Sequence, residues 1–306
     1  MSRELADYAG LEALWSRFVP ETPFGRAAKA HAATFTERPA LEERWDLTDE
    51  ALRLLEALDA DRVRLDRVGH HLKRLPRFPE APREAFDEVE LFQLKKFLAN
   101  HRSLLGLLPG GTAARFGLAP LPEALHALLG AGREGDESFH VTDAFDPALA
   151  DVRRRIRAVD EAAAALVAAR EEALRARFGL AFEGRPFLLV PRGRIGEPAA
   201  AADLLDLEPW DDARLCARPR ASAEALRLAE EKAALLARER EVEARVLAAL
   251  SAPLSEALPL LLGQARAVER LDLALAGARL AREARLVRPV LHDGAVRVEG
   301  GRHLPT

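Results

Sequence analysis

The sequence predicts a mainly α-helical fold, in which a helical core carries a long antiparallel pair of helices, the lever, with a small β-containing module, the clamp, at its tip. Three observations predict it. Apolar residues recur at three- and four-residue spacing over most of the 306 residues. Residues 146–178 and 222–250 each have a narrow, heptad-like apolar seam, which is typical of helices that pack on each other. Between them, residues 179–220 are interrupted by Gly and Pro and have strand-like apolar runs.

Composition and charge are those of a soluble globular protein. The 45 basic and 49 acidic residues give a net charge of −4, which argues against a uniformly basic surface but allows a local basic site. Cys216 is the only cysteine, so neither an intramolecular disulfide nor a cysteine-based metal site can form. The N-terminus lacks the apolar region of a secretory signal, and no run of 18 apolar residues occurs. We therefore expect a cytoplasmic protein without a membrane partner.

Two amphipathic helices are expected in the first part of the core, residues 1–145. Residues 48–75 repeat apolar side chains at helical spacing, and Thr48 or Asp49 is the expected N-cap. Residues 82–108 form the second helix, in which six apolar side chains are expected to face inward: Phe86, Val89, Leu91, Leu94, Phe97 and Leu98. A stretch rich in Gly and Pro follows, and a short helix is expected near residues 121–130.

The outgoing lever helix, residues 146–178, has a strong start signal, because Asp146 can cap it and Pro147 fits its first turn. No Gly or Pro follows until Gly179, so a helix of roughly 48 Å is expected. Arg170 interrupts its apolar seam, which consists of Val152, Ile156, Val159, Ala163, Leu166, Ala173, Leu174 and Phe178.

The returning lever helix, residues 221–250, has Ser222 as a candidate cap. Its expected seam consists of Leu226, Ala229, Ala233, Leu236, Val242, Val246 and Leu250. Neither lever seam buries much apolar surface by itself, so the two helices are expected to pack on each other as an antiparallel pair.

The clamp, residues 179–220, is expected to contain a hairpin whose turn is Gly184-Arg185-Pro186, with residues 181–182 and 187–190 as its strands. After the lever, residues 251–285 are expected to complete the core, since residues 255–283 are apolar around much of a helix. Residues 286–306 are expected to form strands about a turn at Asp293-Gly294.

No catalytic set emerges from the sequence. No Gly is followed by Lys, so the phosphate-binding motif G-x-x-x-x-G-K-[ST] is absent, and neither G-x-S-x-G nor H-E-x-x-H occurs. His70 and His71 are adjacent on a helix, where their side chains diverge by about 100°, and no third ligand accompanies them. We therefore expect no catalytic residue, no metal site and no cofactor in this chain.

The clamp contains six arginines, and forked guanidinium donors are suited to phosphate. It also contains seven carboxylates, so phosphate binding requires the arginines to gather on one face. The acids cluster at 203–212 and the arginines at 185–194 and 214–220, which slightly favours such a separation. A phosphate-binding face and a merely solvated face are both compatible with this pattern.

The chain resembles the MutS family of DNA mismatch-repair ATPases in the order of these parts and in the sequence of its last residues. The resemblance depends on Val287-Arg288-Pro289-Val290-Leu291, Asp293-Gly294 and Gly300-Gly301-Arg302-His303. It is supported by VERLDLALAGARLA (268–281) and by EVELFQLKKFL (88–98). The order of segments covers most of the chain, whereas the specific motifs cover mainly the last forty residues.

The resemblance implies that the clamp grips the DNA backbone of duplex or branched DNA without reading sequence. The candidate phosphate contacts, assigned by their position in the module, are Arg185, Arg192, Arg194, Arg218 and Arg220. It further implies a parent protein in which residues 286–306 lead into an ATPase domain that is absent here. That parent would bind ATP and Mg²⁺ and form a homodimer largely through the ATPase, so we expect this chain alone to be a monomer.

Several features depart from the family pattern. The mismatch-reading domain is missing, and although Phe86 and Glu88 match its F-x-E motif, they lie in a stretch expected to be a core helix and do not take over that role. The family's Pro after GGRH is Leu304 here. These departures indicate a shorter branch of the family. The alternative is a coiled-coil scaffold that binds a partner protein instead of DNA, which the near-neutral clamp favours.

Overall fold

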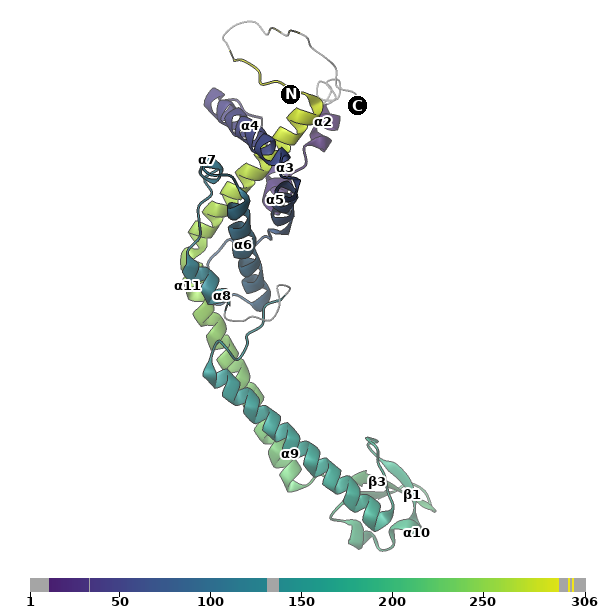
Figure 1. Cartoon of the computed structure of the whole chain (residues 1–306). Coiled ribbons are helices and arrows are strands. Elements are labelled where there is room, and N and C mark those ends of the chain that lie inside the picture. The colour runs from purple at the N-terminus through teal and green to yellow at the C-terminus, as the bar shows by residue number, and fades with distance from the viewer. Residues whose placement is uncertain (1–10, 33, 131–137, 292–296, 298, 300–306) are drawn as a thin grey trace. The chain divides into compact units, whose positions relative to one another are not determined.

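A computed structural model describes residues 11–32, 34–130, 138–291, 297 and 299. Their fold is mainly helical with one small three-stranded antiparallel sheet, as the sequence predicts (Figure 1). The chain divides into two compact units. We call residues 1–140 with 247–306 the core unit, and residues 141–246 the arm unit. The expected turn at Asp293-Gly294 and the motif at 300–303 lie outside the described residues. Residues 286–291, where a strand was expected before that turn, are described and form no strand, so this part of the prediction is wrong.

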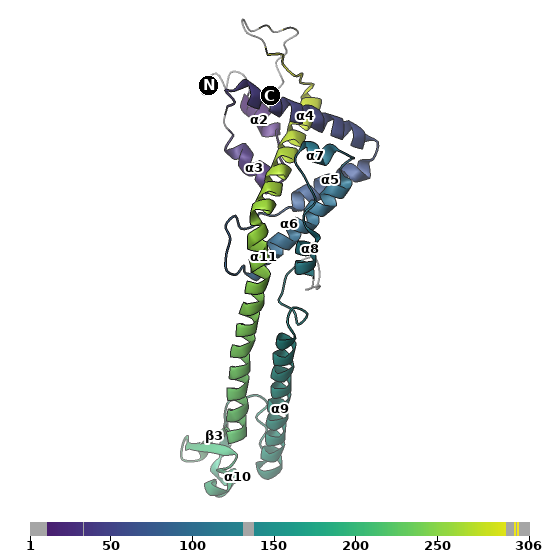
Figure 2. The ribbon, with the colours of Figure 1, turned by 90° about the vertical axis from the view of Figure 1, so that its left-hand side faces the viewer.

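The core unit is an assembly of helices around the last part of the long helix α11 (Ala223–Ala284), as Figure 2 shows. The others are α2 (Leu11–Arg17), α3 (Pro23–Ala30), α4 (Arg38–Asp59), α5 (Arg62–Arg74), α6 (Glu88–Leu107), α7 (Thr112–Arg115) and α8 (Glu123–Gly130). Their leucines make up most of the core, and the rings of Phe24, Phe78 and Phe97 meet at centroid distances of 4.7–6.2 Å. The predicted short helix near 121–130 is confirmed as α8.

The sequence predicts a single helix over residues 48–75, and this prediction is wrong. Two separate helices, α4 and α5, cover most of these residues. α4 begins ten residues earlier, at Arg38, where Pro39 occupies the first turn. Thr48 is therefore no cap, and its hydroxyl donates to the carbonyl of Arg44 one turn back. The chain breaks at Asp61, whose carboxylate accepts from the Arg64 amide at 3.0 Å and starts α5.

Helix α6 begins at Glu88 and not at residue 82. A reciprocal capping box sets its start: Asp87 accepts from the Glu90 amide at 2.7 Å, and Glu90 accepts from the Asp87 amide at 3.1 Å. Phe86 is fully buried, as expected, but it precedes the helix, so the F-x-E match spans the cap. Val89, expected to face inward, is 63% exposed because it lies on the opposite side from Leu91 and Leu94.

The arm unit contains α9 (Pro147–Phe178), which lies alongside the first part of α11 (Figures 1 and 2). The predicted caps of α9 are confirmed: Asp146 accepts from the Ala148 amide at 2.8 Å, and Gly179 ends the helix in the left-handed conformation at φ 63°. Ser222 caps α11 through the Ala225 amide at 3.1 Å. Ion pairs prove the antiparallel order, because Asp146 pairs with Arg245 whereas Asp160 pairs with Lys232.

The seams of the two helices differ in how well the sequence predicts them. Along α9, Val152 and Val159 are buried, and Ile156, Ala163 and Leu166 pack against the same cluster. Between residues 223 and 250 of α11 the buried residues are Leu228, Leu235, Val242, Val246 and Leu250. Leu226, Ala229 and Ala233, which were predicted to lie in the seam, are exposed, so that part of the prediction is wrong. The seam runs through Lys232 and Glu239, which pair with Asp160 and Arg153 of α9. Because charged residues occupy seam positions, the apolar spacing in the sequence does not show which face of α11 packs against α9.

The clamp sheet has the strand order β1-β3-β2, with β1 (Leu188–Pro191), β2 (Leu205–Pro209) and β3 (Arg214–Pro219). The predicted hairpin about Gly184 is therefore wrong. A turn does exist there, since Glu183 and Gly184 have positive φ, but residues 181–182 form no strand. β1 pairs instead with β3, and the hairpin is β2–β3. The inner sheet face buries Val190, Leu205, Leu215 and Ala217 together with Leu174 of α9, so burial selects the pairing.

The returning lever helix and the core helix expected at 255–283 are one element, α11, so the predicted break is wrong. Pro253 and Pro259 lie inside it. Each interior proline costs roughly 3 kcal/mol, because it removes an amide donor and crowds the preceding turn. A buried stripe of four leucines runs past both prolines: Leu250, Leu254, Leu258 and Leu261. Burial of each leucine contributes about 1.5–3 kcal/mol, so packing offsets both prolines and the helix continues.

Among the described residues, α11 is also the one helix whose length and composition would allow it to cross a membrane. One 18-residue window has a mean hydropathy of 1.6, and 33% of that window is buried. A single such helix is weak evidence, because the core helix of a soluble protein passes the same criterion. The expectation of a protein without a membrane partner stays a prediction.

Candidate nucleic-acid interface

The outer face of the clamp sheet carries both signs of charge. Side chains alternate between the two sheet faces, and since the inner face is apolar, Asp206, Glu208, Arg214 and Arg218 share the outer one. Asp206 lies directly opposite Arg218 in the register. The acidic run 203–212 and the basic run 214–220 therefore lie beside each other and not on separate faces.

Ion pairs neutralise most arginines of this region. Arg218 donates to the Glu208 carboxylate at 3.0 Å, and Arg220 donates to the Asp206 carboxylate at 2.6 Å and to the carbonyl of Ala202 at 2.6 Å. Arg185 lies 3.4 Å from the Glu183 carboxylate beside the Gly184 turn. Three of the five candidate phosphate contacts thus already have a carboxylate partner.

Arg192 and Arg194 differ from the other candidates. Both belong to the single-turn helix α10 (Arg192–Ile195), which directly follows β1, and both are exposed. Arg194 donates to the carbonyls of Gly179 at 2.7 Å and Phe178 at 3.3 Å. Arg192 donates to the carbonyl of Asp211 at 3.2 Å. Within the part of the chain that the structure describes, neither has a carboxylate within 4.0 Å, so the charge of both stays uncompensated.

Arg194 also stabilises the end of α9. The last carbonyls of a helix lack amide partners and carry partial negative charge, so a guanidinium at this end satisfies both needs. Gly179 allows the approach, since a Cβ at this position would lie 3.1 Å from the Arg194 Nη2 atom. The sequence predicted Arg194 as a phosphate contact but gave no sign of this structural contact.

Exposed apolar side chains accompany the arginines of the clamp. Phe187 and Leu189, at β1, are 43% and 37% exposed, and Trp210, in the β2–β3 turn, is 57% exposed. The Arg192 amide donates to the carbonyl of Ala213 in the same turn, so Arg192 and Trp210 belong to one edge of the clamp. Trp210 was not predicted as a site residue, although its place between Pro209 and Asp211 indicates an aromatic side chain in a turn.

The motifs that carry the family resemblance lie in the core unit where they are described. Asp272 of the 268–281 stretch is buried and accepts from the amides of Glu21 and Thr22 and from the Thr22 hydroxyl, at 2.7–2.8 Å. Burial raises the pKa of the Asp272 carboxyl. Arg288 pairs with Asp46 and Asp49 of α4 and lies over the Trp45 ring, and hydrogen bonds to these carboxylates raise its pKa.

The described residues contain no group of three or more His, Cys, Asp or Glu side chains placed to hold a metal ion. His70 and His71 are close neighbours, with ring centroids 5.3 Å apart, and both line a pocket between α5 and α6.

The fold and the clamp together define a class: a helical protein whose paired-helix arm carries a small sheet module with a mixed-charge face and two uncompensated arginines at its edge. No protein-family model matches the sequence, and no curated protein sequence matches it.

Proposed function

We propose that this chain is a non-catalytic DNA-binding arm, in which the α10 edge of the clamp contacts the phosphate backbone of duplex or branched DNA. The observation that carries the proposal is the pair Arg192 and Arg194, whose exposed guanidinium groups, within the described part of the chain, donate to carbonyl oxygens and pair with no carboxylate. Each guanidinium has five N–H donors, so both retain donors for phosphate oxygens. Contacts to phosphate require no base reading and give binding that is independent of sequence.

Charge decides which part of the clamp suits DNA. The outer sheet face pairs Arg218 and Arg220 with carboxylates, so a phosphate there must displace an existing partner and meet a second anion. Arg192 and Arg194 impose no such cost. We therefore rank these two above Arg185, Arg218 and Arg220 as backbone contacts.

Fluorescence anisotropy with labelled duplex and branched DNA, at low salt and over a salt series, tests the proposal. The double variant Arg192→Gln/Arg194→Gln should bind at least tenfold more weakly, and the slope of log K against log salt should fall by about 2, since each phosphate contact contributes roughly 0.9. The matched control is Arg154→Gln/Arg175→Gln, which removes two exposed α9 arginines paired with Asp151 and Glu172. Equal losses in both double variants, or no binding by the unaltered chain at low salt, contradict the proposal.

A second candidate function is a scaffold that binds a partner protein through the clamp. The exposed Phe187, Leu189 and Trp210 favour it, because tryptophan and other aromatic residues are enriched where proteins bind each other. The DNA titration separates the two functions. If the unaltered chain does not bind DNA, the scaffold is favoured, and Trp210→Ser is then the variant expected to abolish association with a partner.

The proposal extends to the parent protein. The order of helical core, lever and clamp supports a MutS-like protein in which an ATPase domain supplies ATP- and Mg²⁺-dependent activity and dimer contacts. Translation of the coding sequence downstream of Thr306 tests this directly. A G-x-x-x-x-G-K-[ST] motif there supports the extension, and a stop codon at that point contradicts it.

A further inference from the structure

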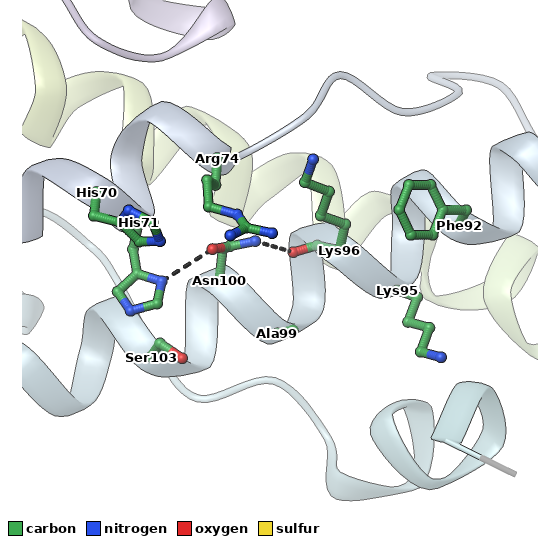
Figure 3. A pocket seen from close by; sticks show the side chains of 9 residues that line it. All are labelled: His70, His71, Arg74, Phe92, Lys95, Lys96, Ala99, Asn100 and Ser103. Atoms are coloured by element: carbon green, nitrogen blue, oxygen red, sulfur yellow. Dashed lines mark hydrogen bonds between the residues drawn. The ribbon is translucent and has the colours of Figure 1, made fainter. Parts of the chain in front are cut away.

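The core unit contains a basic pocket between α5 and α6 that is separate from the clamp. It has a volume of about 210 Å³. Its cationic or ionisable lining residues are His70, His71, Arg74, Lys95 and Lys96, and no carboxylate among the described residues lines it. The remaining lining residues are Phe92, Ala99, Asn100 and Ser103 (Figure 3).

Helical spacing brings these cations together. On α6 the lining positions 92, 95, 96, 99, 100 and 103 form one stripe, because residues three and four apart share a face. On α5, His70, His71 and Arg74 form the facing stripe. Figure 3 shows Arg74 beside Asn100, between His71 and Lys96, whereas Lys95 points away from them. Arg74, His71 and Lys96 therefore form the centre of the pocket and Lys95 its rim.

Hydrogen bonds hold the central polar groups of the pocket in place. Asn100 is buried, and its amide nitrogen donates to the carbonyl of Lys96 at 2.8 Å. Its Oδ1 atom must then accept, so the contact of 2.9 Å from the His71 Nδ1 atom makes that nitrogen the donor. The Lys96 stem packs near Phe92, with Nζ 5.8 Å from the ring centroid.

The cations of this pocket lie together without a counter-charge among the described residues. Elsewhere arginines pair repeatedly with carboxylates, as Arg153, Arg218 and Arg282 do. Within the described ranges, by contrast, Arg74, Lys95 and Lys96 have no carboxylate within 4.0 Å, and both lysines are half-buried. Like charges that gather without carboxylates repel one another, so an anion that binds among them is attracted by their combined charge.

We propose that this α5–α6 pocket binds a phosphate group. A point charge from Lys96 and a forked guanidinium from Arg74 are the two donor types that proteins use for phosphate. The pocket is smaller than the 300–1,000 Å³ typical of sites for whole drug-sized ligands, so it accepts one phosphate group and not an entire nucleotide. The phosphate is either free inorganic phosphate or one group of a nucleic-acid backbone.

Isothermal titration calorimetry with inorganic phosphate, at constant ionic strength set with chloride, tests the proposal on the full chain. The unaltered chain should release heat with phosphate and gain a higher melting temperature, since a ligand that binds the folded state stabilises it. Arg74→Gln/Lys96→Gln should weaken phosphate binding at least tenfold. Lys73→Gln is the matched control, because Lys73 is also on α5 but pairs with Glu21, 3.7 Å away. The phosphate affinity of this variant should differ less than twofold from that of the unaltered chain.

A second variant guards against loss of fold. Lys96→Met keeps the apolar stem that packs near Phe92 and removes only the charge, so it should weaken phosphate binding several-fold at an unchanged melting temperature. No phosphate binding by the unaltered chain, or equal binding by the unaltered chain and Arg74→Gln/Lys96→Gln, overturns the proposal.

Competition identifies the source of the phosphate group. If a short DNA duplex displaces inorganic phosphate from the unaltered chain, and Arg192→Gln/Arg194→Gln leaves phosphate binding intact, the pocket accepts backbone phosphate. If the duplex does not compete, the pocket is a site for free phosphate. Because the clamp variant leaves the pocket untouched, failure of the clamp proposal and failure of the pocket proposal give different results.

Discussion

His101 lies in the core unit as a neutral imidazole of defined tautomer. The Gln264 Oε1 atom accepts from the Ala119 amide at 2.9 Å, so it is also the acceptor for the His101 Nε2 atom at 3.1 Å. Nε2 is therefore protonated, and the buried Nδ1 atom has no partner within the described residues. Burial lowers the pKa of His101, since a charged ring would bring an unsatisfied N–H into the core.

This arrangement predicts a loss of stability in mild acid. Because the folded-state pKa of His101 lies below its unfolded value of about 6.5, the unfolded chain binds the proton more tightly, and stability falls as pH drops through that window. Denaturant titrations at pH 7.5 and 5.5 measure the loss. His101→Leu should reduce the difference in unfolding free energy between the two pH values. His31→Gln, at an exposed position, should leave that difference unchanged. An unaltered slope in His101→Leu contradicts the assignment.

Asp272 connects α11 to the start of α3 by accepting three hydrogen bonds. Thr22 accepts in turn from the Gly25 amide at 2.9 Å, so the carboxylate orders the cap of α3. We expect Asp272→Asn to destabilise the core unit by about 1–3 kcal/mol, because one carboxylate oxygen becomes an amide nitrogen that faces a buried donor. Denaturant unfolding measures this, with Asp59→Asn, at an exposed ion pair with Arg282, as the control expected to cost less than about 0.5 kcal/mol.

At the scale of elements, polar contacts accompany the narrow seam of the arm unit. Arg153 of α9 donates to Glu239 and Glu243 of α11, each at 2.7 Å, and to Asp143 and the carbonyl of Val141 at 2.9–3.0 Å. A single guanidinium thus joins both helices and the segment before α9. Its planar fork holds five N–H donors in a fixed geometry, whereas an ammonium group has only three.

We expect Arg153→Ala to destabilise the arm unit by about 1–3 kcal/mol, because it leaves three carboxylates close together without their cation. Arg153→Lys should recover only part of this. Hydrogen exchange of the α9 amides measures the change locally. Arg154→Ala is the neighbouring control, since it pairs within its own helix turn with Asp151 and should cost less than about 0.5 kcal/mol. Equal protection in Arg153→Ala and Arg154→Ala would show that the network contributes little.

At the scale of the molecule, the sequence predicts best those elements whose ends depend on local chemistry. Asp146, Pro147 and Gly179 bound α9 as predicted, because caps act within a few residues. Pairings that depend on distant burial were missed. The turn at Gly184 is real, yet β1 pairs with β3, since the apolar core beneath the sheet determines the partner. α11 continues past Pro253 because buried leucines outweigh a local breaker.

The candidate sites likewise combine features that the sequence predicts with features that depend on contacts between distant residues. The sequence located arginines in the clamp, but the β2–β3 register determines that Arg218 and Arg220 are neutralised while Arg192 and Arg194 are not. Counting charged residues along the sequence does not show which of them face each other across two strands. The α5–α6 pocket was missed for a related reason: its cations come from two helices, and only the packing of α5 on α6 brings them together with no acid among the described lining residues.

The contact between Arg194 and the end of α9 has a thermodynamic consequence. A phosphate that binds the remaining donors of Arg194 shares this guanidinium with the carbonyls of Phe178 and Gly179, which accept from its Nε and Nη2 atoms. Ligand capture at the clamp edge and fraying of the last α9 turn are therefore linked equilibria, and each must weaken or strengthen the other by an equal free energy. Binding of a ligand to Arg194 would in this way change the stability of the C-terminal turn of α9.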